Sequence, residues 1–216
     1  GLAFDHLIFT GATSIARHIM AAAARNLVPV TLELGGKSPV IISRSADIEK
    51  SLGCIMVGKT LNAGQICLAP DYLLVPEEKL NEVIEAAQKA VAEMYPSLLA
   101  NPSYTSVINQ RHFDRLNGYL AEAEERGQKI IPVNPANEDF SKQEGTLKIP
   151  PTLIPEPAED LKVLQDEIFG PLLPIRTYKA FDETIDYINS KPRPLAAYYF
   201  GEDAAEEQAF TSRTTS

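Results

Sequence analysis

The chain has 216 residues, of which 44% are hydrophobic and 23% charged, a balance that is ordinary for a soluble globular protein. Its 20 Lys and Arg against 29 Asp and Glu give a net charge of −9, which repels phosphate backbones and argues against nucleic-acid binding. No apolar stretch approaches the roughly 20 residues that span a bilayer, and two cysteines and three histidines argue against a disulfide scaffold or a metal site.

The first third of the chain alternates short apolar runs with one helical pattern. A strand, a crossover helix and a second strand in this order are typical of a parallel sheet. Thr13 or Ser14 can cap the helix, because each places a side-chain oxygen at its start. The predicted elements are a strand over residues 6–10, a helix over 13–25, and strands over 28–34 and 39–42.

The remaining residues continue the alternation, which predicts an α/β fold with a mostly parallel twisted sheet and helices on both faces. In the first of the remaining helices, we expect Leu52, Ile55 and Met56 to face the core and Cys54 to pack beside them. The predicted helices are 47–63, 77–95, 109–126, 182–189 and 204–212, the predicted strands are 72–75, 129–133, 152–154, 172–178 and 196–200, and 134–145 is an exposed polar segment.

Cys67 is the first residue with chemistry that an enzyme could use. It follows the Gly64–Gln65 turn beyond a helix, where a thiol can reach a cleft and backbone N–H groups can gather around its target. The negative end of the helix dipole disfavours a thiolate there, so activation requires a cation such as Lys37 or a cationic cofactor ring. The alternative is a small core residue, the commoner role of a lone cysteine.

Three other segments carry weaker signals. Glu33 interrupts an apolar strand, where partial desolvation would make it a stronger base, although the outward-facing residue of an alternating strand is the commoner role of such an acid. Residues 11–14 (GATS) lie between a strand and a helix, where parallel-sheet proteins bind phosphate, but helix capping also explains them. Glu167 lies beside Phe169 in a Gly-Pro turn, where an acid could hold a ribose diol or belong to an ordinary turn.

These signals occur together in an order that resembles one family. The motifs of the aldehyde dehydrogenase superfamily are similar to FTGAT (9–13), LELGGKSP (32–39), GQIC (64–67) and EIFGP (167–171). The spacings also fit this family, since 34 residues separate Glu33 from Cys67 and 100 separate Cys67 from Glu167. The tail KPRPLAAYYFG (191–201) resembles the class that includes coniferyl and fatty aldehyde dehydrogenases.

The resemblance implies the NAD- or NADP-dependent oxidation of a small aldehyde, aromatic in the coniferyl class, to a carboxylic acid. Cys67 would attack the aldehyde carbonyl to give a thiohemiacetal, and loss of hydride to the cofactor would leave a thioester. Glu33 would activate the water that hydrolyses this thioester. Intact Cys67 and Glu33 favour this enzyme over a non-catalytic domain of the same fold that serves oligomer or partner contacts. Glu33 also argues against an acyl-phosphate or acyl-CoA reductase.

The resemblance also implies where the cofactor would bind. Gly11, Ala12 and Thr13 would lie along its pyrophosphate, Glu167 would hold the nicotinamide ribose, and Phe169 would shape the same pocket. Many relatives carry Ser where Ala12 stands, so a phosphate-binding hydroxyl is missing there.

A full family member is about twice as long, so the resemblance implies that this chain is a part of one. Residues 1–32 would be the last βα unit of the nucleotide-binding domain, and residues 33–216 a catalytic domain truncated at its C-terminal end. The lack of a starting Met and of a signal peptide predicts a chain that begins within a domain of a cytoplasmic protein. We expect the full-length protein to be a homo-oligomer, the chain alone to be inactive, and Cys67 rather than Cys54 to be the reactive thiol.

Overall fold

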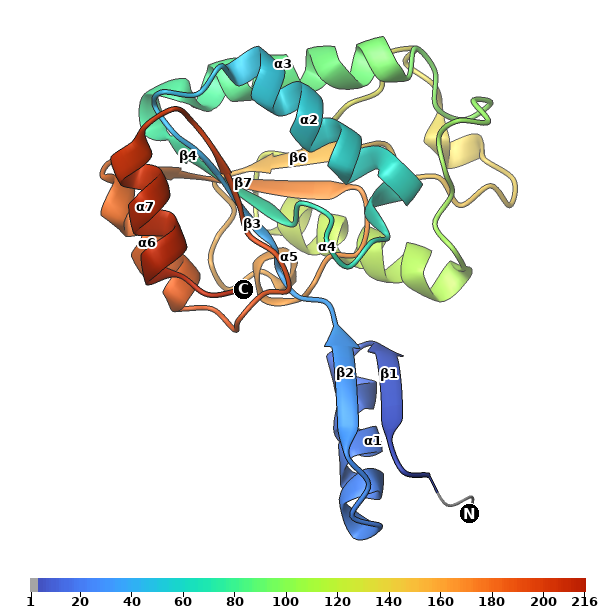
Figure 1. The fold of residues 1–216 in the computed structure, drawn as a ribbon. Helices are drawn as coiled ribbons and strands as arrows, with labels where there is room; N and C mark the ends of the chain where they lie inside the picture. The colour runs from blue at the N-terminus through green and yellow to red at the C-terminus, as the bar shows by residue number, and fades with distance from the viewer. Residues whose placement is uncertain (1–3) are drawn as a thin grey trace.

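The computed structural model describes residues 4–216, and these residues begin with a small β–α–β unit. Strands β1 (Leu7–Gly11) and β2 (Val30–Leu34) pair in parallel, and α1 (Thr13–Arg25) is the crossover between them. Figure 1 shows this unit in blue, projecting from the rest of the molecule. The predicted parallel crossover is therefore confirmed, and β2 continues two residues beyond the predicted domain boundary at 32.

The start of α1 differs from the prediction. Its N-cap is Ala12, and no side chain accepts a hydrogen bond from the first turn. Thr13 and Ser14 do not cap the helix, because both lie inside the first turn rather than before it. The first amides of α1 are therefore left without a side-chain acceptor.

A six-stranded sheet forms the larger body, in the spatial order β5-β6-β7-β4-β3-β8. Every neighbouring pair is parallel except β5 and β6, so the prediction of a mostly parallel sheet is confirmed. The strands are β3 (Pro39–Ile42), β4 (Tyr72–Pro76), β5 (Ile131–Pro132), β6 (Thr152–Pro155), β7 (Leu172–Tyr178) and β8 (Tyr198–Phe200).

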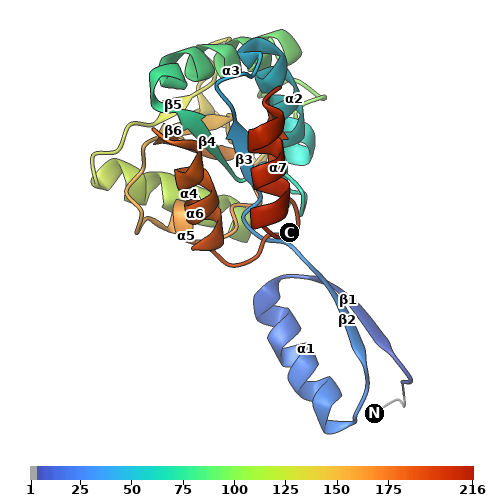
Figure 2. The ribbon, with the colours of Figure 1, turned by 60° about the vertical axis from the view of Figure 1, so that its left-hand side comes forward.

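Helices cover both faces of this sheet, as predicted (Figures 1 and 2). On one face, apolar residues of β3, β4 and β7 pack against α2 and α3, whereas α4, α5, α6 and α7 cover the other face. The sequence pattern missed α5, since four residues are too few to show a helical period. The helices are α2 (Ile48–Thr60), α3 (Leu80–Met94), α4 (Gln110–Glu125), α5 (Lys162–Gln165), α6 (Phe181–Asn189) and α7 (Ala204–Arg213), and short 3₁₀ turns span Leu61–Gly64, Glu77–Lys79 and Phe140–Lys142.

The orientation of α2 corrects one prediction. Leu52, Ile55 and Met56 are buried as expected, but Cys54 is exposed. A helix turns about 100° per residue, so Cys54 lies about 200° from both Leu52 and Met56 and faces solvent. Cys54 is therefore not a core residue, and its reactivity is not limited by burial.

Candidate active site

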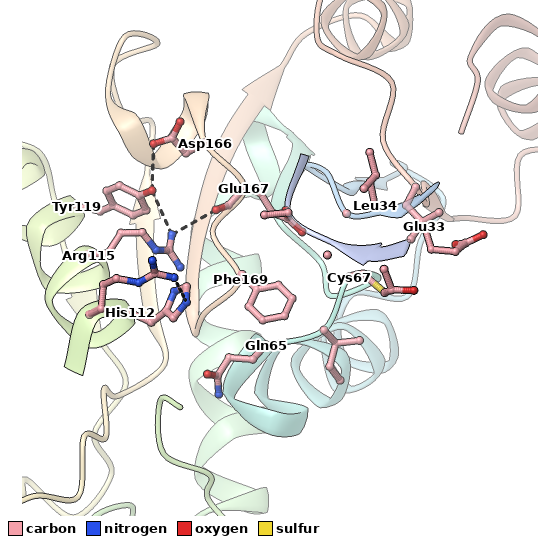
Figure 3. A pocket seen from close by; sticks show the side chains of 17 residues that line it. Glu33, Leu34, Gln65, Cys67, His112, Arg115, Tyr119, Asp166, Glu167 and Phe169 are labelled. Atoms are coloured by element: carbon pink, nitrogen blue, oxygen red, sulfur yellow. Dashed lines mark hydrogen bonds between the residues drawn. The ribbon is translucent and has the colours of Figure 1, made fainter. Parts of the chain in front are cut away.

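A cavity of about 860 Å³ lies between the β1–α1–β2 unit and the six-stranded body. Figure 3 shows the side chains that line it, which come from segments far apart in the sequence. Thr13 is not among the lining residues, although it lies next to one of them. The predicted site residues that line the cavity are Gly11, Ala12, Glu33, Cys67, Glu167 and Phe169.

The β1–α1–β2 unit contributes the carboxyl ends of its two parallel strands. Thr10 lies opposite Glu33 and Gly11 opposite Leu34, so all four residues reach the cavity at the same edge of this small sheet. Ligands of parallel α/β proteins bind at this edge, where the amides of the following helix also point. The uncapped start of α1 therefore offers unpaired donors to a phosphate group.

The turn that carries Cys67 has an unusual backbone. After α2, the φ angles of Asn62, Ala63 and Gly64 are 52°, 53° and 71°, in the left-handed region that costs a non-glycine residue about 1–3 kcal/mol. Glycine is required at the third position, because a Cβ there would lie 2.3 Å from the carbonyl oxygen of Gly170. This reversal ends the helix and presents half-buried Cys67 to the cavity.

The Gln65 side chain fixes this turn to the segment before α4. Its amide nitrogen donates to the carbonyl oxygens of Asn62 and Ser106 at 2.9 and 3.1 Å, and its amide oxygen accepts from the Ile108 N–H at 2.8 Å. The side chain is buried, so these hydrogen bonds are shielded from water. Cys67 is therefore displayed on a rigid turn.

The Glu167 carboxylate packs against the backbone of Gly35, where a Cβ would lie 1.9 Å from Oε1. Burial raises the pKa of Glu167, while a backbone hydrogen bond from Gly36 and the charges of Arg115 and Lys37 pull it the other way. The glycine pair after β2 thus allows an acid on the opposite segment to approach closely. This contact explains physically why the LELGGKSP and EIFGP motifs occur together.

Phe169 and Gly170 shape the loop that follows Glu167. Phe169 has a φ of 45°, a strained value for an aromatic residue, and Figure 3 shows its ring near the middle of the cavity. A Cβ on Gly170 would lie 2.5 Å from Leu116, so glycine allows the loop to pack on α4. Phe169 lines the cavity, and its role in shaping a cofactor pocket stays a prediction.

Helix α4 supplies cavity residues that the sequence analysis missed. Arg115 donates to the carbonyl oxygens of Glu167 and Ile168 at 3.3 and 2.7 Å, and so holds the loop that carries Glu167. Arg111 also lines the cavity. The spacing of these two arginines by four residues on a predicted helix was the available signal, since it places them on one face.

His112 lines the cavity beside these arginines and has an unusual environment. Its Nδ1 is buried and has no hydrogen-bond partner among the described residues. Burial and the charges of Arg115 and Arg111 lower the pKa of His112. A buried nitrogen without a partner is costly, and a polar group of a bound ligand would satisfy it.

Glu33 is the predicted site residue whose setting differs most from expectation. It is exposed, because the alternation of β2 places Thr31 and Glu33 on the open face of the strand. Figure 3 shows its carboxylate directed away from Cys67. The described residues therefore do not bury the Glu33 carboxylate as the first alternative predicts. Its position matches the second alternative, an outward-facing residue of an alternating strand.

Lys37 does not activate Cys67, contrary to one possibility from the sequence. Its ammonium donates to the Asp71 carboxylate and to the carbonyl oxygens of Val163 and Asp166, and these bonds use its three N–H groups. Among the remaining neighbours of the thiol, the Tyr198 hydroxyl donates to the carbonyl oxygen of Leu68 at 2.7 Å. Burial and the nearby Cys67 raise the pKa of Tyr198.

The residues present fit a nucleotide cofactor. The uncapped start of α1 suits a phosphate group, and the Glu167 carboxylate can accept hydrogen bonds from hydroxyl groups. The His112 nitrogen that lacks a partner among the described residues could bond to a polar group of the cofactor. Between residues 4 and 216, no group of three or more His, Cys, Asp or Glu side chains is arranged to hold a metal ion. The helices in the same range include none that is both long and apolar enough to cross a membrane.

Fold and site together define a parallel α/β protein with a cysteine displayed at a nucleotide-sized cavity. The aldehyde dehydrogenase family model matches residues 3–216, and the chain belongs to this family. It is 60% identical over 213 residues to a coniferyl aldehyde dehydrogenase of Pseudomonas sp. strain HR199. The aligned region covers 99% of this chain and 44% of that protein. The chain thus spans less than half the length of the curated relatives it matches.

Solved structures show the same fold. The chain is 38% identical to Staphylococcus aureus AldH in a substrate-bound state, with a TM-score of 0.89 over 98% of this chain and 44% of that one. It is 28% identical to a betaine aldehyde dehydrogenase of Staphylococcus aureus solved in complex with NAD⁺, with a TM-score of 0.84 over 97% of this chain and 42% of that one. The predicted fold class and family resemblance are therefore confirmed.

Proposed function

We propose that the chain is the catalytic part of an NAD(P)-dependent aldehyde dehydrogenase. Residues 1–32 would belong to the nucleotide-binding domain and residues 33–216 to the catalytic domain. The observation that carries the proposal is the single cavity onto which Cys67, Glu33 and Glu167 all open, although they come from three separate motifs. Membership of the aldehyde dehydrogenase family supports the same reaction.

The proposed reaction begins at Cys67. Its thiolate sulfur attacks the aldehyde carbonyl carbon, and the resulting alkoxide is a thiohemiacetal. The C–H bond then breaks as the carbonyl re-forms, which leaves a thioester on Cys67. The bound cofactor supplies the acceptor for the departing hydride. The strained turn at Asn62–Gly64 and the buried Gln65 hold the sulfur in one place during these steps.

Glu33 acts in the second half of the reaction. Its carboxylate takes a proton from water, the water oxygen attacks the thioester carbonyl carbon, and the C–S bond breaks to release the acid and the Cys67 thiolate. Because the carboxylate is exposed and directed away from the sulfur, it acts after a rotation of its side chain.

Residues of both parts of the chain would hold the cofactor. Gly11, Ala12 and Thr13, at the uncapped start of α1, would lie along its pyrophosphate, Glu167 would accept from the ribose hydroxyls, and Phe169 would shape the same pocket. We propose NAD or NADP, supported by the NAD⁺ complex of the structural relative. The proposal assigns no residue from 4 to 216 to the 2′-position of the adenosine ribose, so it covers both NAD and NADP.

The substrate we propose is an aromatic aldehyde of the coniferyl type, since a relative that is 60% identical carries that name. The full-length protein should reduce NAD or NADP with such an aldehyde and release the carboxylic acid. A panel of aromatic and aliphatic aldehydes with each nucleotide, monitored at the absorbance of the reduced cofactor, tests the proposal. No reduction with any pair would contradict it and would favour a non-catalytic domain. A cytoplasmic homo-oligomer remains a prediction for the full-length protein.

The 216 residues alone should be inactive as a dehydrogenase. The chain spans only 44% of the coniferyl aldehyde dehydrogenase it resembles. Its own cofactor contacts would be the 11–13 turn, Glu167 and Phe169, whereas hydride transfer requires the reacting atoms to be held about 3–3.5 Å apart. Calorimetric titration of the purified chain with NAD should show no binding in the micromolar range. Tight binding or aldehyde turnover near one per second would show that these residues suffice.

A further inference from the structure

One buried ion pair lies at the point where three motifs of the chain meet. The Lys37 ammonium and the Asp71 carboxylate are in direct contact, and their side chains are only 8% and 4% exposed. Lys37 belongs to the segment that follows Gly35, and Asp71 lies four residues after Cys67, just before β4. Neither residue has a role in the proposed reaction.

Both partners also hold the loop that carries Glu167. Lys37 donates to the carbonyl oxygens of Val163 and Asp166, each at 2.9 Å. The second carboxylate oxygen of Asp71 accepts from the Ile168 N–H at 2.9 Å. The backbone is therefore bonded to the ion pair immediately before and immediately after Glu167.

The pair is linked to the turn that carries Cys67 through the chain itself. Asp71 is only four residues after Cys67 in the chain. Lys59 of α2 donates to the carbonyl oxygen of the intervening Pro70 at 2.8 Å. Lys59 is itself buried, so a second ammonium reinforces the same corner of the fold. These charged contacts thus add to those of Arg115 and Gln65 in setting the distance between the sulfur and the Glu167 carboxylate.

Such a pair is a poor device for stability alone. Removing two charges from water is costly, and apolar residues of similar volume often stabilise a fold equally well. The Lys37–Asp71 pair differs from apolar packing because its hydrogen bonds are directional. They fix the position of the Glu167 loop relative to the segments that carry Lys37 and Asp71.

We propose that the Lys37–Asp71 pair is a positioning element that sets Glu167 at a fixed place relative to Cys67, and that its effect is on cofactor binding. The proposal rests on the proposed function, in which Glu167 holds the nicotinamide ribose. Lys37 and Asp71 are positioning residues, since they act through the loop. Substitution of Lys37 and Asp71 should therefore leave the nucleophilicity of Cys67 nearly unchanged.

The test uses two variants of the full-length enzyme, Asp71→Asn and the double variant Lys37→Met/Asp71→Asn. We expect the KM for NAD to rise on the order of 10- to 100-fold in both, because small misplacements in a site have effects of this size. Hydrolysis of a nitrophenyl ester by Cys67 needs no cofactor and should change by less than about threefold. The double variant removes both charges and so avoids leaving Lys37 buried without a partner.

Lys148 provides a matched control. It is also a buried lysine, and it holds another loop by donating to the carbonyl oxygens of Leu98, Leu99 and Asn101 at 2.8–2.9 Å. This loop does not line the cavity. Lys148→Met should lower the unfolding temperature as much as Asp71→Asn does, but it should leave the KM for NAD unchanged.

Hydrogen exchange gives a second readout that does not depend on activity. The amides of residues 163–168 should exchange faster in the double variant, while those of residues 61–67 keep their protection. A folded double variant with wild-type KM for NAD and wild-type exchange in 163–168 would overturn the proposal. A wild-type enzyme that hydrolyses the ester but oxidises no aldehyde would instead refute the proposed function, so the two failures are distinguishable.

Discussion

The β1–α1–β2 unit and the six-stranded body reach the same cavity from opposite sides, but they are held together very differently. Within residues 4–34, Ala16 is the single fully buried residue, whereas the body has three clusters of buried apolar side chains on its two sheet faces. The unit also leaves large apolar side chains in solvent, namely Ile8, Ile15, Met20 and Leu27.

This difference separates the two halves of the proposed chemistry. The body carries Cys67 and Glu167, and buried contacts through Gln65 and the Lys37–Asp71 pair hold them. The unit carries Glu33 and the phosphate-binding turn, on a two-stranded sheet that is marginal by itself. The residues proposed for the covalent chemistry are therefore held by buried contacts of the body, whereas the proposed base and phosphate site stand on a unit that buries little surface of its own.

The largest expected effect comes from the body. Cys67→Ser in the full-length enzyme should lower kcat for aldehyde oxidation by roughly 10⁴-fold or more, because a hydroxyl without a base is a far weaker nucleophile than a thiolate. Steady-state assays measure this loss. Cys54→Ser is the matched control, since this exposed residue of α2 lies outside the cavity and should leave kcat unchanged. An equal loss in both variants would break the assignment.

The next effect comes from the unit. Glu33→Gln should slow steady-state turnover by about 10²–10⁴-fold, the usual contribution of a general base, because thioester hydrolysis needs a proton acceptor. The first turnover should survive, so rapid mixing should show a burst of reduced cofactor near one equivalent of active sites. Retention of full steady-state activity would remove Glu33 from the reaction.

Hydrogen exchange tests the structural side of the comparison. In the 216-residue chain, the amides of α1 should be protected on the order of 10²-fold less than those of β4 and β7, because opening the unit exposes almost no buried surface. Mass spectrometry of peptic fragments gives this ratio. Equal protection in both parts would show that the unit is stable without further contacts, and the comparison would fail.

A smaller effect is expected on the pH dependence of folding stability, because the body contains the buried ammonium of Lys59. Burial lowers the pKa of Lys59 to about 8 from its ordinary 10.5. Below pH 8 the buried ammonium carries its full cost, and between pH 8 and 10.5 the unfolded chain binds more protons than the folded one. Folding stability relative to Lys59→Met should therefore rise with pH in that window, by at most about 1.4 kcal/mol per pH unit. Urea unfolding of both proteins at several pH values measures the difference.

The strand and helix pattern of the body could be predicted from the sequence because it is local. The periodicity of 172–178 gave β7 with its observed bounds, and the apolar stripe of 77–95 gave α3. The four-residue α5 gave no such signal. Cys54 was placed in the core because of its apolar neighbours, although its own position on the helical period faces solvent.

The site was predictable only in part, for a physical reason. Cys67 and Glu167 stand in motifs that can be read from neighbouring residues. The hub formed by Lys37 and Asp71 depends on contacts with Val163 and Asp166, which are more than ninety residues away along the chain, and no local pattern encodes them. The sequence leaves two interpretations of Glu33 open, and the exposed face of β2 in the small β1–β2 sheet decides for the outward-facing one.

The most direct test is to trap the acyl group on Cys67 of the body in a variant that lacks the Glu33 base of the β1–α1–β2 unit. The full-length Glu33→Gln variant, mixed with NAD and an aromatic aldehyde and then quenched in acid, should carry a new mass on the peptide that contains Cys67. That mass should equal the aldehyde less one hydride and one proton, and the peptide that contains Cys54 should stay unmodified. A burst of reduced cofactor with no adduct on Cys67, or with the adduct on Cys54, would contradict the account.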